Sequence, residues 1–217
     1  MVEFSPLEVS AWIKKLGPSF KDALVPLGLS CIFPYHQIKV DEPLLQAATN
    51  FWISSRHVFH FNNMEICPTL EEFSAIMGEP NVSTLILPTI GNDFADLAHD
   101  LLGISLATSQ QWCMLDHLNI HMVFAFFSRL SVPVTGRGRS HYLNAFCLWL
   151  LARYFLVNKT YRVDQRMCLV VNNLDKGSLV GMILVETLNG LDVVHREEAT
   201  FFTGNALLLQ VRSLIFA

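Results

Sequence analysis

The sequence predicts a mainly α-helical fold, a multi-helix array with one small β-hairpin near residues 57–67. Three observations predict it: apolar residues recur at helical spacing along most of the chain, capping residues mark helix starts, and one short stretch has strand character. With 217 residues, the chain is long enough to bury one sizeable core. We therefore predict a single domain over 1–217, with the best candidate for an internal boundary at 131–140.

The first elements are two short helices over 6–16 and 19–27, followed by an irregular connection. A clearer helix begins at Asp41, a good N-cap, and its apolar face runs on to Phe51 and Trp52. Extended runs then flank Asn62-Asn63, two residues that tolerate positive φ. This arrangement predicts the hairpin.

The strongest local signal lies immediately after the hairpin. The sequence Thr69-Leu-Glu-Glu72 fits a capping box, in which a hydroxyl and a carboxylate satisfy each other's backbone amides. Gly78 and Pro80 then stop the helix.

The rest of the chain reads as further helices separated by looser stretches. A loose region at 81–93 and a Gly/Arg linker at 133–140 interrupt the pattern. The expected helices cover 94–102, 109–130, 142–157, 162–171, 178–191 and a last segment from about 197. The sequence stops in an apolar run at 213–217 without a glycine or a polar tail, so we expect a C-terminally truncated domain.

Composition narrows the class of protein. Hydrophobic residues make up 52% and charged residues 16%, against roughly 25% charged in ordinary soluble domains. The strongest apolar run, 142–157, is too short for a spanning helix and contains Arg153. The shortage of charge therefore favours a fragment whose apolar surface is covered by a missing part of the chain or by a partner.

Charge and cysteine usage point to an intracellular protein. The five cysteines are scattered and odd in number, and no secretory signal opens the chain, so we expect reduced, buried thiols. A net charge of −4 argues against a generic nucleic-acid-binding surface.

One set of residues could hold a metal. Cys113, His117 and His121 recur every four residues, which places them on one face of the helix predicted over 109–130. Thiolate and imidazole are the preferred ligands of zinc. The set lacks the glutamate of a metalloprotease motif and a second ligand pair, so an amphipathic packing face is favoured.

The sequence offers few other candidates for a binding or catalytic site. Arg137 and Arg139 in a Gly-Arg-Gly-Arg turn could contact nucleic-acid phosphates, although an exposed linker is favoured. There is no nucleophile elbow and no phosphate-binding loop. We therefore expect no enzymatic activity and no cofactor.

The segment 44–80 resembles the plant mobile domain, also called the aminotransferase-like plant mobile domain. That family has a Trp-ended helix, a Phe-rich hairpin with an acidic residue, and a helix capped by Pro/Thr-Leu-Glu and stopped by Gly. Here these features fall on Trp52, Phe59, Phe61, Glu65, Pro68, Thr69, Leu70, Glu72 and Gly78. A second patch, 179–209, is similar to a variant found in uncharacterised and retrotransposon-associated plant proteins.

The resemblance implies a non-catalytic nuclear interaction module that supports transposon silencing, genome maintenance and meristem maintenance. It implies a long-form serine/threonine protein phosphatase as partner, and it does not imply aminotransferase activity. Two alternatives stay open. One is a transposon-borne nucleic-acid-associated domain that uses Arg137 and Arg139, and the other is a zinc-dependent enzyme built on Cys113, His117 and His121.

Overall fold

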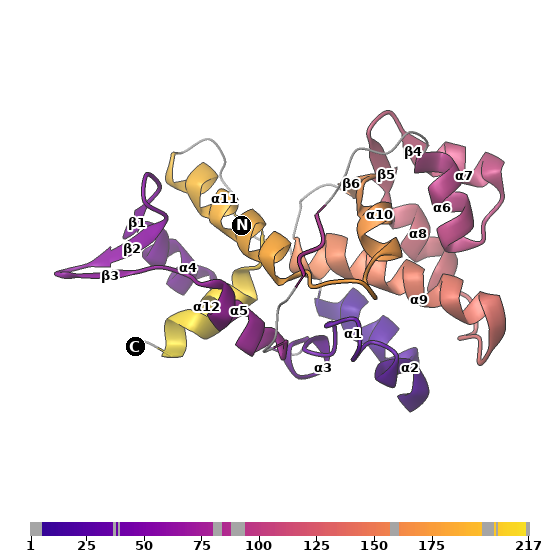
Figure 1. The fold of residues 1–217 in the computed structure, drawn as a ribbon, viewed down its shortest axis with the longest axis horizontal. Helices are drawn as coiled ribbons and strands as arrows, with labels where there is room; N and C mark the ends of the chain where they lie inside the picture. The colour runs from indigo at the N-terminus through magenta and orange to yellow at the C-terminus, as the bar shows by residue number, and fades with distance from the viewer. Residues whose placement is uncertain are drawn as a thin grey trace.

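The computed structural model describes residues 6–36, 38, 40–79, 84–87, 94–156, 161–196, 202 and 204–215. Within these ranges the fold is mainly helical, with two small antiparallel sheets of three strands each (Figure 1). The predicted fold class is confirmed. The second sheet is an addition that the sequence did not predict.

The larger part of the protein surrounds one apolar helix. Helix α9, Gly136–Leu150, continues as a π-helical segment, Leu151–Phe155, and all side chains from Ala145 onward are buried. A helix that is apolar on all sides is buried on all sides, and neighbours pack around it (Figure 1). The helices that contribute side chains to the core around α9 are α1 (Pro6–Lys15), α2 (Pro18–Asp22), α3 (Ile32–Tyr35), α6 (Phe94–Leu102), α7 (Leu106–Trp112), α8 (Ile120–Phe127) and α10 (Met167–Asn172).

The smaller part forms around the predicted hairpin. Its elements are α4 (Glu42–Thr49), β1 (Trp52–Ile53), β2 (Val58–Phe61), β3 (Met64–Ile66), α5 (Leu70–Met77), α11 (Val180–His195) and α12 (Ala206–Ile215). Figure 1 shows these elements on one side of the molecule, with α12 beside α4 and α5. They enclose a second apolar cluster, made of Leu45, Ala48, Trp52, Phe59, Leu191, Phe202, Ala206 and Leu209.

The hairpin prediction is confirmed and extended. Strand β2 pairs with β3, with Phe61 opposite Met64, and Asn62 in the turn has a positive φ of 51°. The helix predicted to run on to Trp52 ends earlier, at Thr49. Trp52 instead begins a third strand, β1, opposite Phe59, which lets both aromatic side chains enter the small apolar cluster.

The prediction of a single helix over 109–130 is wrong. The chain leaves α7 at Trp112 and forms strands β4 (Cys113–Met114) and β5 (His117–Asn119), which are joined by β6 (Arg162–Asp164). Leu115 at the turn has a φ of 57°. Asn119 then starts α8, because its Oδ1 accepts hydrogen bonds from the N–H groups of His121 and Met122. An asparagine competes with the helix backbone for hydrogen bonds and therefore favours a cap over a helix interior.

Three further boundaries differ from expectation. The stretch 133–140, predicted as a linker, contains the first turn of α9. The irregular connection predicted through Pro34 contains most of the short helix α3, and the helix predicted over 162–171 is divided into β6 and α10. The loose region 81–93 lies outside the described residues except for Thr84 to Leu87, and so do 157–160 and the start of the last predicted helix at 197–200.

The capping box at Thr69 is confirmed. Thr69 Oγ1 accepts from the Glu72 N–H at 3.2 Å, and the Glu72 carboxylate accepts from the Thr69 N–H at 3.0 Å. We expect Thr69→Ala to lower the free energy of unfolding by about 1 kcal/mol, because one helix N–H loses its partner. Urea denaturation measures this. A Thr49→Ala control, in the half-buried last position of α4, removes only a bond from the hydroxyl to the Gln46 carbonyl near the surface and should change it by less than about 0.5 kcal/mol.

Candidate functional site

The three metal candidates do not share a helix face. Cys113 lies on β4, His117 on β5 and His121 in the first turn of α8. His121 packs edge-on against Tyr161, with ring centroids 5.0 Å apart. Across the described ranges, no group of three or more His, Cys, Asp or Glu side chains is placed to hold a metal ion. The spacing of four residues therefore does not place the three side chains on one face of a helix, as the metal-site hypothesis required.

The cysteines are free thiols of two kinds. Burial and the neighbouring Glu79 charge raise the pKa of Cys31 to about 12, and burial raises the pKa of Cys168 to about 12. Cys147 is also buried and its pKa is raised by desolvation. These groups stay protonated at neutral pH, whereas a nucleophilic cysteine needs a lowered pKa. The expectation that the thiols are buried is wrong for Cys67, which is exposed, and for Cys113, which is half-buried.

The residues that carry the family resemblance hold the small part of the fold together. Glu65 pairs with Arg56, and Gly78 ends α5 with a left-handed φ of 79°. The other predicted motif positions lie as follows: Phe61 packs on Phe51 and Phe59, Pro68 precedes the α5 cap, and Thr69 and Glu72 form the cap itself.

Trp52 belongs to a partly buried polar cluster that the sequence did not predict. Its indole Nε1–H donates to Asp192 Oδ1 at 2.8 Å, and His57 Nε2 lies 2.9 Å from Asp192 Oδ2. The His57 ring stacks on the Trp52 ring, and Arg196 approaches the same carboxylate at 3.5 Å. Asp192 is buried, so this carboxylate ties β1 and the β1–β2 turn to α11.

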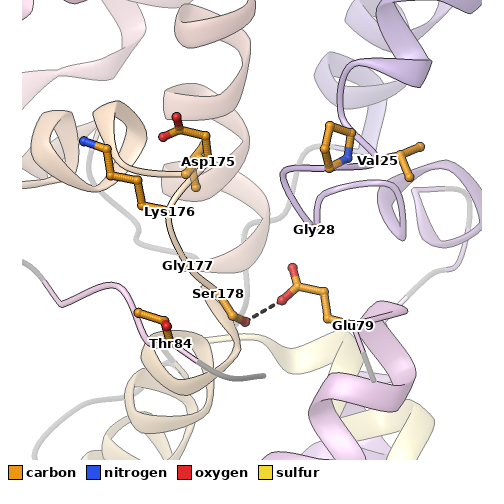
Figure 2. A pocket seen from close by; sticks show the side chains of 10 residues that line it. Val25, Gly28, Glu79, Thr84, Asp175, Lys176, Gly177 and Ser178 are labelled. Carbon is orange, nitrogen blue, oxygen red and sulfur yellow. Dashed lines mark hydrogen bonds between the residues drawn. The ribbon is translucent and has the colours of Figure 1, made fainter. Parts of the chain in front are cut away.

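A polar cavity of about 300 Å³ lies where three connections meet (Figure 2). It is lined by Val25, Pro26, Gly28, Glu79, Thr84, Leu174, Asp175, Lys176, Gly177 and Ser178. In Figure 2 the side chains of Glu79 and Ser178 point toward each other, and the Ser178 hydroxyl donates to the Glu79 carboxylate. Backbone hydrogen bonds between Ser178 and Thr84 (2.8 Å) and between Ile86 and Ser178 (3.0 Å) close the junction.

This cavity lacks the parts of a nucleophilic site. Its lining contains no histidine and no cysteine, and a serine nucleophile needs an adjacent base to take its proton. Asp175 and Lys176 point away from the Glu79–Ser178 pair (Figure 2). The arrangement joins the end of α5 to the α10–α11 connection, and we assign it a structural role.

The two candidates for nucleic-acid contacts, Arg137 and Arg139, lie in different environments. Arg139 donates to the Ser19 carbonyl at 2.6 Å and to the Val134 carbonyl at 3.1 Å, and its guanidinium lies over the Phe20 ring. It thus fastens α2 and the preceding loop to α9. Arg137, two positions earlier in the same turn, is exposed.

Arg137 belongs to a surface at the connection between α8 and α9. Apolar side chains are exposed there: Phe126 by 45%, Leu130 by 41% and Val134 by 77%. The cations Lys15, Arg129 and Arg137 accompany them, all exposed. We name these six residues the α8–α9 corner surface. The Lys15 ammonium donates to the Ser128 carbonyl, which places the end of α1 beside this corner.

A sequence signal for this surface was available and was missed. Between Asp116 and Asp164 the chain contains no Asp or Glu, although its net charge is −4. The basic residues of the stretch are Arg129, Arg137, Arg139, Arg153, Lys159 and Arg162. The overall charge therefore conceals a local excess of positive charge, which averaging over the chain removes.

Comparison with protein-family models, curated proteins and solved structures found no match for this chain. Among the described residues, no helix has the length and apolar character needed to cross a membrane.

Proposed function

We propose that this protein is a non-catalytic protein-interaction module, and that the α8–α9 corner surface is its contact face. The observation that carries the proposal is the exposure of Val134, Leu130 and Phe126 within one short segment. Grouped exposed apolar side chains bordered by polar residues are typical of protein-contact sites. Phe126 also offers an aromatic anchor, a residue type enriched at interfaces.

The resemblance to the plant mobile domain supplies the first partner and compartment to test. We propose that the module acts in the nucleus with a long-form serine/threonine protein phosphatase, in transposon silencing and genome maintenance. The proposal rests on the motif residues around Trp52 and Thr69. These residues build the fold, so the contact itself is assigned to the corner surface.

The proposal predicts loss of a partner when the corner surface becomes charged. We expect the tagged chain to recover the phosphatase from plant nuclear extract, and a Leu130→Glu/Val134→Glu variant to lose at least about nine-tenths of it. Burying two new carboxylates in an apolar interface is costly. Quantitative mass spectrometry of the pull-down measures the recovery.

The matched control is Val185→Glu, because Val185 is 53% exposed on α11 in the other part of the fold. It should retain the partner. Equal recovery by all three proteins would contradict the assigned face. Recovery of chaperones alone by the wild-type chain would remove the proposed function.

The acid-free stretch 117–163 favours one alternative, a nucleic-acid-associated domain that uses Arg137. Phosphate contacts make affinity fall steeply with salt. An oligonucleotide that binds at low salt, and is released by Arg137→Glu, would support it. The exposed aliphatic side chains beside Arg137 have no counterpart on a phosphate backbone, so the protein-contact proposal is preferred.

A further inference from the structure

We infer that the α8–α9 corner surface takes an acidic amphipathic segment of its partner, with apolar residues on one side and carboxylates beside them. The inference rests on the proposed function and specifies the chemistry of the partner. It follows from the combination of side chains: Phe126, Leu130 and Val134 offer apolar contact, whereas Arg129 and Arg137 offer only positive charge.

Charge complementarity selects the partner. No Asp or Glu occurs in the chain from 117 to 163, so the whole α8–α9 segment presents cations alone. The acidic residues on the elements nearest to it are Glu8 on α1, Asp22 at the end of α2, Asp96 and Asp100 on α6, and Asp164 on β6. A basic segment would meet like charges along the corner, which costs affinity and favours the acidic partner.

The backbone of the corner is held in place before any partner arrives. The Lys15 ammonium binds the carbonyl of Ser128, and Arg139 binds the carbonyl of Val134 at 3.1 Å. The Leu130 N–H donates to the Phe127 carbonyl at 3.1 Å, which shapes the turn after α8. Since these bonds already order the loop, binding does not have to pay for ordering it.

An acidic peptide fits these features better than a nucleic acid does. Single-stranded nucleic acids are bound by basic grooves lined with aromatic platforms for the bases. Here the most exposed apolar side chain is the aliphatic Val134, at 77%, and Phe126 packs edge-on against the Trp112 ring with centroids 5.8 Å apart. Apolar contact therefore accompanies charge at this corner, which is the pattern that an amphipathic helix matches.

The test uses three labelled probes and fluorescence anisotropy with the full chain. The first is a synthetic peptide of about 18 residues with leucines at helical spacing and glutamates beside them. The second has lysine in place of every glutamate, and the third is a single-stranded oligothymidine of about 20 nucleotides. We expect the acidic peptide to bind, and the affinity to fall about ten-fold in Arg137→Glu and in Val134→Glu.

Two control variants accompany the test, and each contrary result has a distinct meaning. Lys176→Glu and Val185→Glu make the same changes elsewhere on the surface and should alter affinity less than two-fold, with circular dichroism verifying the fold of each variant. Equal binding of the lysine peptide, or no binding of the acidic peptide, would overturn the inference. Oligothymidine binding that depends on Arg137 but not on Val134 would replace it with nucleic-acid recognition. If the pull-down succeeds while the acidic peptide fails, the interaction module stands and only the stated partner chemistry is wrong.

Discussion

Gly204→Ala is expected to lower the free energy of unfolding by about 3 kcal/mol, one of the two largest effects of a single substitution predicted for this protein. Gly204 has a φ of 94°, and a Cβ placed there would lie 2.6 Å from Thr187 Cα and 2.9 Å from the Glu186 carbonyl oxygen. Both obstacles are backbone atoms of α11, which cannot rotate away. The left-handed conformation and the overpacking each contribute roughly 1–2 kcal/mol.

The damage should extend to the attachment of α12. Next to Gly204, the Asn205 N–H donates to Thr187 Oγ1 at 3.0 Å, its side-chain amide donates to the Tyr154 carbonyl, and its Oδ1 caps α12 by accepting from Leu208. These bonds require the close approach that only glycine permits. Urea denaturation followed by circular dichroism measures the loss.

Gly138→Ala is the matched control. Gly138 lies inside α9, and a Cβ there would meet Pro133 at an ordinary 3.7 Å. This variant should stabilise the protein by about 0.5–1 kcal/mol, because alanine is the better helix former. Equal stability of the two variants would contradict the packing described for Gly204.

The second large effect is expected from Asp192→Ala, which should cost about 3 kcal/mol. The change leaves the Trp52 indole N–H without an acceptor in a buried site and removes the partner of His57 and Arg196. An unsatisfied buried donor bears its full desolvation penalty. Asp192→Asn keeps one oxygen in place and should cost about 1 kcal/mol.

A double-mutant cycle tests the cause of the Asp192 effect. In a Trp52→Phe background the indole donor is absent, so Asp192→Ala should cost at least about 1 kcal/mol less than in the wild type. Asp100→Ala is the control, since the Asp100 side chain is 83% exposed, and it should change stability by less than about 0.5 kcal/mol. A cost of Asp192→Ala that is the same in both backgrounds would separate Asp192 from Trp52.

The sequence predicted those elements whose signals are local. The capping box at Thr69, the N-cap at Asp41 and the Asn62 turn each depend on side chains within a few residues of the bond they make. The helix over 94–102 was also predicted with its observed bounds. Local chemistry decides such features, so a single sequence is enough to find them.

The features that were missed depend on residues far apart in the sequence. Strands β5 and β6 pair with each other although α9 lies between them in the sequence, with Leu118 opposite Val163. The pattern of apolar residues within 109–130 gives no sign of this distant partner. Asp192 meets Trp52 across 140 positions. The basic corner around Arg137 is missed for a different reason. The net charge is an average over the whole chain, and an acidic average predicts an exposed linker at Arg137 rather than a basic surface.

The small apolar cluster has a consequence for how the chain is made. It joins Leu45, Trp52 and Phe59 to Leu191 and Leu209, so its first half leaves the ribosome long before its second half exists. During that interval a growing chain exposes a tryptophan, a phenylalanine and the edges of a short sheet, the features that drive misassembly of nascent proteins. Most of the core around α9 comes from residues that are made earlier, and Leu207 and Leu208 of α12 join it last. Synthesis thus passes through a stage in which most of the large core is present while the small cluster still lacks half of its side chains, and a chaperone would find its binding site on the small cluster.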